Sequence, residues 1–204
     1  NDPPVAEDLV VTFQEDIGGT VMLIGSDTDS PDSSLTFTIV DQPTHGTVTQ
    51  PGRIAFDTWT YTQTDTNYSG SDSFTYSVSD GELLDTAMVN ITITPVNDAP
   101  EFTSDPVTAA VEDAAYNYTA TALDVDEGDV LTFDAIILPG WLSFDGDSTI
   151  SGTPADGDVG QHFVVLTVSD GDVTVEQSFT ITVENTNDPP VAEDLVVTFQ
   201  EDIG

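Results

Sequence analysis

Apolar and polar residues alternate with a period of two in several short segments of this chain. Residues 89–94 read Val-Asn-Ile-Thr-Ile-Thr, and residues 179–183 read Phe-Thr-Ile-Thr-Val. Such alternation, rich in threonine and β-branched residues, predicts strands with one buried face. Turn signals such as Asp80-Gly81 and Asp170-Gly171 separate these segments. No segment of useful length has helical periodicity, so the pattern predicts an all-β fold.

An exact duplication sets the larger organisation of the chain. Residues 1–18 return unchanged as residues 187–204, which gives a period of 186 residues. This period exceeds the length of one ordinary small domain, so each repeat is expected to contain two domains. A chain that starts its own sequence again is expected to be a piece of a tandem array.

A weaker repeat inside this period divides the chain further. Glu-Asp, Asp-x-Asp, Val-Ser-Asp-Gly and Asn-Asp-x-Pro motifs occur twice in the same order with nearly fixed spacing. We therefore predict one domain at residues 1–97, a second at 98–187, and the first strand of the next copy of domain 1 at 188–204. Short strands in domains of this size predict two tandem Greek-key β-sandwiches, each antiparallel with about seven strands, joined end to end.

The charge of the chain requires an explanation. It has 38 acidic residues, one basic side chain (Arg53) and a net charge of −37, yet 38% of its residues are hydrophobic and it contains no cysteine. A compact chain with this charge repels itself, and it also repels nucleic acid and anionic membrane surfaces. Bound divalent cations or a high-salt habitat would offset the charge. We expect a monomer with no nucleic-acid partner and no membrane insertion.

The predicted topology places the acidic motifs at the ends of the domains. In domain 2, a strand over residues 115–122 spans roughly 25 Å at ~3.3 Å per residue, so Glu112 and Asp124 lie at opposite ends. The junction of the two domains then combines one end of domain 1, the linker and one end of domain 2. Its candidate metal ligands are Glu15, Asp16, Asp65, Asp72, Asn97, Asp98, Asp124, Asp126, Asp129 and Asp170.

Calcium suits this ligand set best, because Ca²⁺ takes six to eight oxygen ligands in flexible geometry. We expect several ions at the junction. Magnesium suits such an irregular site less well, and zinc is disfavoured because cysteine is absent and His45 and His162 lie in different domains. A solvated acidic surface in a salt-adapted protein is the alternative. Partial sites are expected at the outer ends, at Asn1, Asp2, Asp27, Asp29, Asp80, Glu112, Asp113, Asp156, Asp158, Asn187 and Asp188.

The chain resembles the cadherin-like repeats of large bacterial surface adhesins, including RTX adhesins. Residues 131–133 (Leu-Thr-Phe), 138–142 (Leu-Pro-Gly-Trp-Leu) and 150–154 (Ile-Ser-Gly-Thr-Pro) resemble the dystroglycan-type, or putative Ig, module, and residues 70–76 resemble the related bacterial repeat. The resemblance implies inter-domain Ca²⁺ bound by a Glu after the first strand, a linker Asn-Asp and a following Asp-x-Asp. The Asp-Arg-Glu motif of cadherins is absent, so Asp65, Asp72, Asp156 and Asp158 are assigned in its place.

The function expected from the sequence is that of an extender. Calcium at the junctions would stiffen the array, which would project a distal binding domain of a secreted, cell-surface adhesin, with neighbouring repeats of the same chain as partners. The alternative is a carbohydrate-binding module in which Trp59 and Trp141 stack on sugar rings, although core packing is the favoured role of both. An enzyme is not expected, because no Ser-His-Asp set is evident and calcium accounts for the carboxylate pairs.

Overall fold

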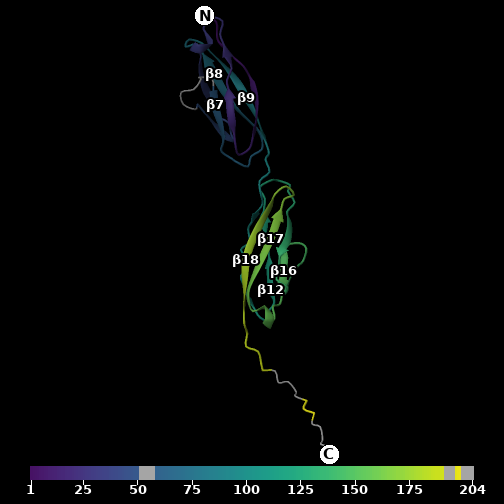
Figure 1. The fold of residues 1–204 in the computed structure, drawn as a ribbon. Helices are drawn as coiled ribbons and strands as arrows, with labels where there is room; N and C mark the ends of the chain where they lie inside the picture. The colour runs from purple at the N-terminus through teal and green to yellow at the C-terminus, as the bar shows by residue number, and fades with distance from the viewer. Residues whose placement is uncertain (51–57, 191–195, 199–204) are drawn as a thin grey trace, which may run out of the picture. The chain divides into compact units, whose positions relative to one another are not determined.

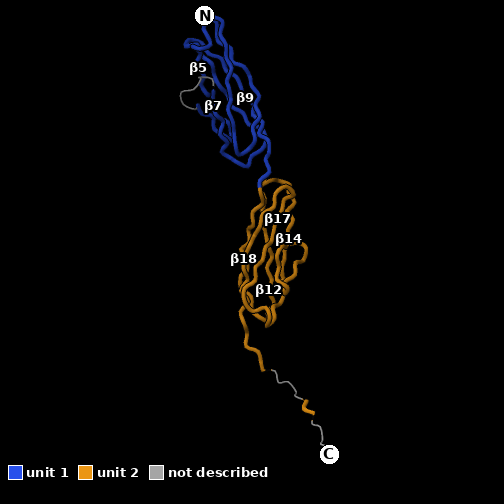
Figure 2. Tube along the Cα trace, viewed as in Figure 1, with its two compact units in different colours: residues 1–98 blue, residues 99–204 orange. Residues whose placement is uncertain are grey.

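A computed structural model of the chain describes residues 1–50, 58–190 and 196–198. The chain divides into two compact units, residues 1–98 and 99–204 (Figure 2). Much of the segment predicted to be the first strand of a further repeat lies outside the described residues, namely 191–195 and 199–204, and residues 196–198 are not in a strand. Within the described part, no helix is long and apolar enough to cross a membrane.

Unit 1 is a sandwich of two sheets (Figure 1). The larger sheet has the order β2-β9-β8-β5, and the smaller has the order β3-β7-β6. A short pair, β1 with β4, and the 3-10 turn η1 complete the unit. The elements are β1 (Val5–Ala6), β2 (Leu9–Gln14), β3 (Gly19–Met22), β4 (Gly25–Ser26), η1 (Asp32–Ser34), β5 (Thr36–Asp41), β6 (Gly46–Thr49), β7 (Thr58–Gln63), β8 (Gly70–Ser79) and β9 (Leu84–Thr94).

Unit 2 repeats this plan, with sheets ordered β11-β18-β17-β14 and β12-β16-β15 and a short pair of β10 with β13. The prediction of an all-β chain built from two Ig-like sandwiches is confirmed. The elements are β10 (Glu101–Phe102), β11 (Ala109–Val111), β12 (Tyr116–Thr119), β13 (Ala122–Leu123), β14 (Thr132–Ile137), β15 (Leu142–Phe144), β16 (Thr149–Gly152), η2 (Asp156–Asp158), β17 (Gly160–Ser169) and β18 (Thr174–Glu184).

The pairing of one edge strand of the larger sheet in each unit, β2 or β11, differs from the antiparallel expectation. β2 pairs in parallel with β9 over six residues, and β11 pairs in parallel with β18 over three. The reason is that the chain first forms a short antiparallel pair, β1 with β4 or β10 with β13, and only then reaches the edge of the larger sheet. The strand predicted over residues 115–122 is likewise divided, into β12 and β13.

The alternating residues produce a separate core in each unit. Val89, Ile91 and Ile93 of β9 are at most 2% exposed, and Ile181 and Val183 of β18 are equally buried. Full burial of such a side chain contributes about 1.5–3 kcal/mol. The fold therefore rests on these inward faces and leaves the ends of each sandwich free to carry acidic loops.

Candidate metal centres

Three segments of unit 2 bring carboxylates together at one end of the sandwich. Glu112 follows β11, Asp156 begins η2, and Asp188 follows β18. Each offers one carboxylate oxygen, and these oxygens lie within 4.8 Å of one another. Glu112 is only 2% exposed, although a buried carboxylate is costly without a partner. Its backbone N–H donates to the carbonyl of Glu184 (3.0 Å), and its Oε2 accepts the N–H of Thr186 (2.9 Å).

The three carboxyl groups of this cluster perturb one another's protonation. Asp156 makes one side-chain hydrogen bond with Glu112 and another with Asp188. The first raises the pKa of Glu112, and the second raises the pKa of Asp188. The same two hydrogen bonds lower the pKa of Asp156. The negative charge of Asp113 adds to the rise at Asp188. The proximity of the three carboxyl groups therefore disfavours their simultaneous ionisation, and a shared proton or a bound cation would relieve this repulsion.

Unit 1 repeats the buried glutamate of this arrangement. Glu15 is 2% exposed, its N–H donates to the carbonyl of Thr94 (3.0 Å), and its Oε1 accepts the N–H of Val96 (2.7 Å). In both units, one glutamate thus fastens the end of an edge strand of the larger sheet, β2 or β11, to the segment that follows the last strand. Asp98 in that segment accepts a long hydrogen bond from Asn67 Nδ2 (3.5 Å).

The residue after each buried glutamate has an unusual backbone conformation. Asp16 has φ 69° and Asp113 has φ 60°, and no other non-glycine residue in the described ranges has a positive φ. Aspartate tolerates this left-handed region better than most residues do. Sequence reasoning did not find this feature, because aspartate gives a much weaker signal than the glycine that usually marks such positions.

The opposite end of unit 2 carries a second acidic cluster. Asp124, Asp126 and Asp129 offer carboxylate oxygens within 4.8 Å of one another. The Oδ1 atom of Asp124 accepts the N–H of Asp126 (3.0 Å), whereas its Oδ2 is buried without a hydrogen-bond partner. Burial raises the pKa of Asp129, and the charges of Asp124, Asp126, Asp170 and Asp172 raise it further.

The equivalent end of unit 1 has the same orphaned oxygen. Asp27 accepts the N–H groups of Asp29 (2.7 Å) and Ser30 (3.0 Å) through Oδ1, and its Oδ2 is buried without a partner. Asp29 in turn accepts the N–H of Asp2 (2.6 Å). A buried carboxylate oxygen without a donor is uncommon in folded proteins and is compatible with a cation ligand. The repeat of the motif at Asp27 and Asp124 was predicted from the sequence, whereas the buried oxygen without a partner in each was not.

Two hairpin aspartates stand beside these clusters. Asp80 Oδ1 accepts the N–H groups of Leu83 and Glu82 (2.7 Å each), and these hydrogen bonds lower the pKa of Asp80. Its Oδ2 accepts Asn1 Nδ2 (2.9 Å). Asp170 caps the corresponding hairpin of unit 2, where it accepts the N–H of Val173 (2.6 Å). Both aspartates therefore have a structural role in their hairpins, and their role as metal ligands stays a prediction.

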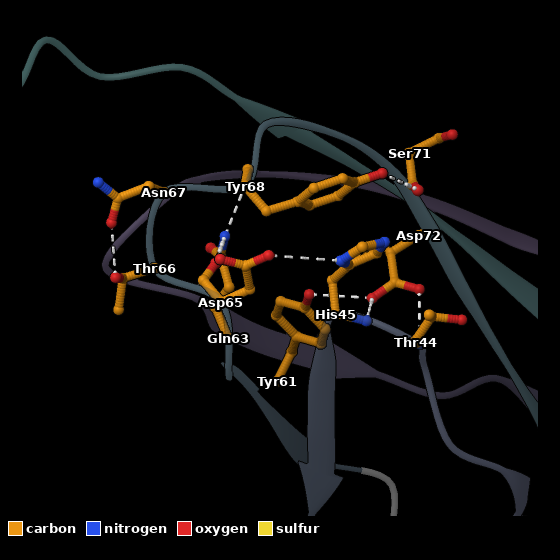
Figure 3. Close-up of polar contacts among 10 residues, drawn as sticks. All are labelled: Thr44, His45, Tyr61, Gln63, Asp65, Thr66, Asn67, Tyr68, Ser71 and Asp72. Atoms are coloured by element: carbon orange, nitrogen blue, oxygen red, sulfur yellow. Dashed lines mark hydrogen bonds and ion pairs between the residues drawn. The ribbon is translucent and has the colours of Figure 1, made fainter. Parts of the chain in front are cut away.

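Asp72 lies inside unit 1 with both oxygens in use (Figure 3). It is 8% exposed; Oδ1 accepts the N–H groups of Thr44 and Ser73, and Oδ2 accepts the N–H of His45 and the hydroxyl of Tyr61. The four distances lie between 2.9 and 3.1 Å. This geometry favours a structural role for Asp72 over the predicted role as a ligand. Burial, together with the charge of Asp72, raises the pKa of Tyr61.

Asp65 lies on the exposed side of the same region (Figure 3). Its Oδ2 is 3.9 Å from His45 Nδ1, and the His45 ring stacks on Tyr68 with 3.4 Å between ring centres.

Asp158, assigned beside Asp156, uses its Oδ2 to accept the N–H of Ala155 (3.0 Å) and is not part of the three-carboxylate cluster. Asn97 and Asn187 are exposed. The junction with ligands from both units and several calcium ions stays a prediction.

The two tryptophans pack on the cores. Trp59 contacts the core of unit 1. Trp141 lies edge-to-face with Tyr116 (5.6 Å between ring centres) and with His162 (5.8 Å) and packs on the core of unit 2. These contacts favour the packing role over stacking on sugar rings.

Comparison with known families assigns an Ig-like domain to each unit. The family described as bacterial Ig domain matches residues 1–92, and the family described as putative Ig domain matches residues 99–184. Families of Ig-like domains are generally non-enzymatic. No curated protein is significantly similar to the chain in sequence.

Solved structures of cadherin repeats share the fold. Repeats EC1–4 of PcdhgB3 match with a TM-score of 0.60 at 15% identity, covering 91% of this chain and 50% of that one. Human protocadherin-24 EC1–2 matches with a TM-score of 0.56 at 14% identity, covering 92% and 100%. An endo-fucoidan hydrolase of glycoside hydrolase family 107, MfFcnA4, is 28% identical over 91% of this chain, with a TM-score of 0.39. The chain spans 29% of the length of that hydrolase.

Proposed function

We propose that the chain is a calcium-rigidified extender segment of a bacterial surface adhesin. The Ig/cadherin-like fold is typical of repeat and adhesion modules, and bacterial Ig-like domains usually occur in extracellular or surface proteins. In this function, Ca²⁺ bound at the ends of the sandwiches replaces repulsion between carboxylates with shared coordination. The chain then acts as a stiff spacer that holds a distal binding domain away from the cell, and it catalyses no reaction.

The observation that carries the proposal is the cluster of Glu112, Asp156 and Asp188. A buried glutamate that is hydrogen-bonded to the segment after the last strand links the interior of the domain to that segment. A cation held by Glu112 and Asp188 would fix the direction in which the chain leaves the domain. The buried orphan oxygens of Asp27 and Asp124 support the same reading at the opposite ends.

The test is a melting and small-angle scattering series on the intact chain. The conditions are chelator, CaCl₂, MgCl₂, and NaCl at matched and at high ionic strength. Calcium sites of extracellular modules have Kd values on the order of 10⁻⁴–10⁻³ M, so millimolar Ca²⁺ should raise Tm and narrow the distribution of interatomic distances. MgCl₂ at the same concentration should do much less.

One result would overturn the proposal. If NaCl raises Tm as far as millimolar CaCl₂ does at equal ionic strength, the carboxylates are screened and not coordinated. The chain would then be a salt-adapted β protein, and an extender stiffened by calcium would no longer be supported. A terbium luminescence titration adds an independent readout, because Tb³⁺ occupies calcium sites and is sensitised by nearby tyrosine or tryptophan side chains.

A further inference from the structure

Gln63, the last residue of β7, uses only one end of its side-chain amide (Figure 3). The residue is 9% exposed, and its Nε2 donates to the backbone carbonyls of Asp65 (2.6 Å) and Tyr68 (2.7 Å). Its Oε1 is buried and has no hydrogen-bond partner. The two carbonyls fix the orientation of the amide, because an oxygen in place of Nε2 would face two acceptors. The side chain is therefore held with its oxygen unused.

Two other glutamines of the chain use both ends of the amide. Gln42 donates to the carbonyl of Val48 (3.1 Å) and accepts the N–H of the same residue (2.7 Å). Gln177 donates to a backbone carbonyl (2.9 Å) and accepts the hydroxyl of Tyr118 (2.8 Å). A buried acceptor without a donor costs free energy unless it meets a water molecule or a cation. Gln63 is therefore set apart by the partner that its oxygen needs.

Buried side-chain oxygens without a partner occur at three positions in the described part of the chain, namely Asp27, Gln63 and Asp124. The two aspartates belong to the repeated Asp-x-Asp motif, and Gln63 comes two residues before Asp65, a candidate ligand. Calcium accepts side-chain amide oxygens as well as carboxylates. The sequence patterns pointed to acids alone, so they did not select Gln63.

Two further segments of unit 1 reach the same end of the sandwich as Gln63. The turn that carries Glu15 leads into Gly18, which lies so close to β7 that an added Cβ would clash with a backbone carbonyl of that strand. The segment after β9 meets the loop after β7, where Asn67 Nδ2 donates to Asp98 Oδ2 (3.5 Å). The unused oxygen is thus close to the segments that carry the candidate carboxylates of unit 1.

The corresponding end of unit 2 is built differently. Counted from Glu15 and Glu112, the registers of β3 with β7 and of β12 with β16 make Pro154 the counterpart of Gln63. Proline offers no side-chain oxygen, but this end gathers three carboxylate oxygens within 4.8 Å of one another. Within the described ranges, unit 1 has no such group of three at its equivalent end. A fixed neutral oxygen therefore stands where unit 2 has a preassembled acidic cluster.

On the basis of the calcium-dependent function proposed above, we propose that Gln63 Oε1 is a ligand of the cation bound at this end of unit 1. The carboxylates of Glu15, Asp65 and Asp98 complete the set, and a neutral ligand adds no repulsion among them. Gln63 then replaces Asp72, which was assigned from the sequence but whose two oxygens already accept four hydrogen bonds. The buried amide is the fixed point on which the more exposed carboxylates close.

A calcium titration of the intact chain, followed by NMR, tests this assignment. The ¹³Cδ resonance of Gln63 reports on its own carbonyl group, and its absence from the spectrum of Gln63→Leu identifies it. We expect this resonance to shift as Ca²⁺ is added, with a midpoint on the order of 10⁻⁴–10⁻³ M. The resonance of Gln42, whose amide is bonded at both ends, is the internal control and should not move.

Matched variants separate coordination from support of the loop. Gln63→Leu removes the oxygen and both donated hydrogen bonds, whereas Gln63→Glu removes the donated hydrogen bonds but keeps an oxygen. The N–H of Val96, which donates to Glu15, reports on this end, and the N–H of Thr186 reports on unit 2. Gln63→Leu should raise the midpoint at Val96 alone by about tenfold or more, because loss of even an outer partner of a metal ligand costs about 10–100-fold. Gln63→Glu should keep the midpoint near that of the wild type.

A charge control completes the set. The double variant Gln14→Glu, Gln63→Leu adds a carboxylate at an exposed position next to Glu15 and should bind as weakly as Gln63→Leu does. Recovery of binding in this variant, or equal weakening by Gln63→Leu and Gln63→Glu, would overturn the proposal. If Ca²⁺ raises Tm while the Gln63 resonance stays in place, the extender function stands and the ligand is rejected. If Ca²⁺ does not raise Tm, both are rejected.

Discussion

The buried acidic residues of the two units differ in how many hydrogen-bond donors surround their carboxylates. Glu15 and Glu112 are buried at the ends of their units, where each accepts a backbone N–H from the segment after the last strand. Asp72 is also buried, but four donors surround it. The number of donors separates the two cases: Asp72 is satisfied by the protein, whereas Glu112 lies beside two more carboxylates.

Glu112→Gln should separate the two energetic effects of this carboxyl group. In chelator the variant should melt at a higher temperature than the wild type, because the pKa of Glu112 is raised and its ionised form is therefore disfavoured in the folded protein. In CaCl₂ the variant should lose much of the increase in Tm. Calorimetry in both buffers measures this, with Glu176→Gln, on an exposed position of β18, as control. A drop in Tm in chelator would mean that the carboxylate is stabilised without metal.

Asp72→Asn should behave in the opposite way. The amide group turns an N–H₂ toward backbone and hydroxyl donors, which leaves buried donors unpaired and costs about 1–3 kcal/mol. The urea midpoint should fall in chelator and in calcium alike, with the calcium-dependent difference unchanged. Asp41→Asn, at an exposed position, is the matched control. Loss of the calcium response with little loss of stability would restore Asp72 to the set of ligands.

At the scale of elements, close approaches between strands and loops position the acidic ends. In unit 2, β16 passes directly against the backbone that leads into β15, and this contact helps fix the hairpin that precedes η2. Gly152 makes the approach possible, since an added Cβ would meet the carbonyl oxygen of Trp141. Because both sides of this contact are backbone, neither can move aside easily to make room for a side chain.

Gly152→Ala should therefore destabilise unit 2 by about 1–3 kcal/mol or more, as overpacking of a rigid contact does. For a domain of this size, Tm should fall by several degrees, on the order of 4–8 °C for each kcal/mol. Gly140→Ala is the control, because an added Cβ there meets nothing within 4 Å. Equal Tm values for the two variants would show that the loop after Pro139 moves aside.

At the scale of the whole molecule, the charge of −37 acts on every step of folding. In chelator, added NaCl should raise Tm steadily, because the screening length falls from about 10 Å at 0.1 M to about 3 Å at 1 M salt. Choline chloride should act as NaCl does, since screening does not depend on the identity of the cation. A clear advantage of NaCl at equal ionic strength would indicate sodium at specific sites instead.

The sequence predicts much of this architecture and less of its chemistry. Alternation in segments such as residues 89–94 identifies strands because every second residue must be buried. The repeated motifs likewise indicate which acids lie at the ends of the domains. The parallel pairing of β2 with β9 was not predictable, because alternation carries no information about direction. The left-handed Asp16 and the donors around Asp72 depend on backbone paths that only the folded chain reveals.

That parallel pairing also bears on how the units respond to force. β2 and β9 are the first and last long strands of unit 1, and they lie side by side in the same direction over six residue pairs. Tension applied at the two ends of the unit pulls these strands in opposite directions along their shared edge, so their hydrogen bonds are sheared together and do not open one at a time. In unit 2, only three pairs join β11 to β18. When the same force acts on both units, unit 2 should therefore unfold first, while unit 1 stays folded.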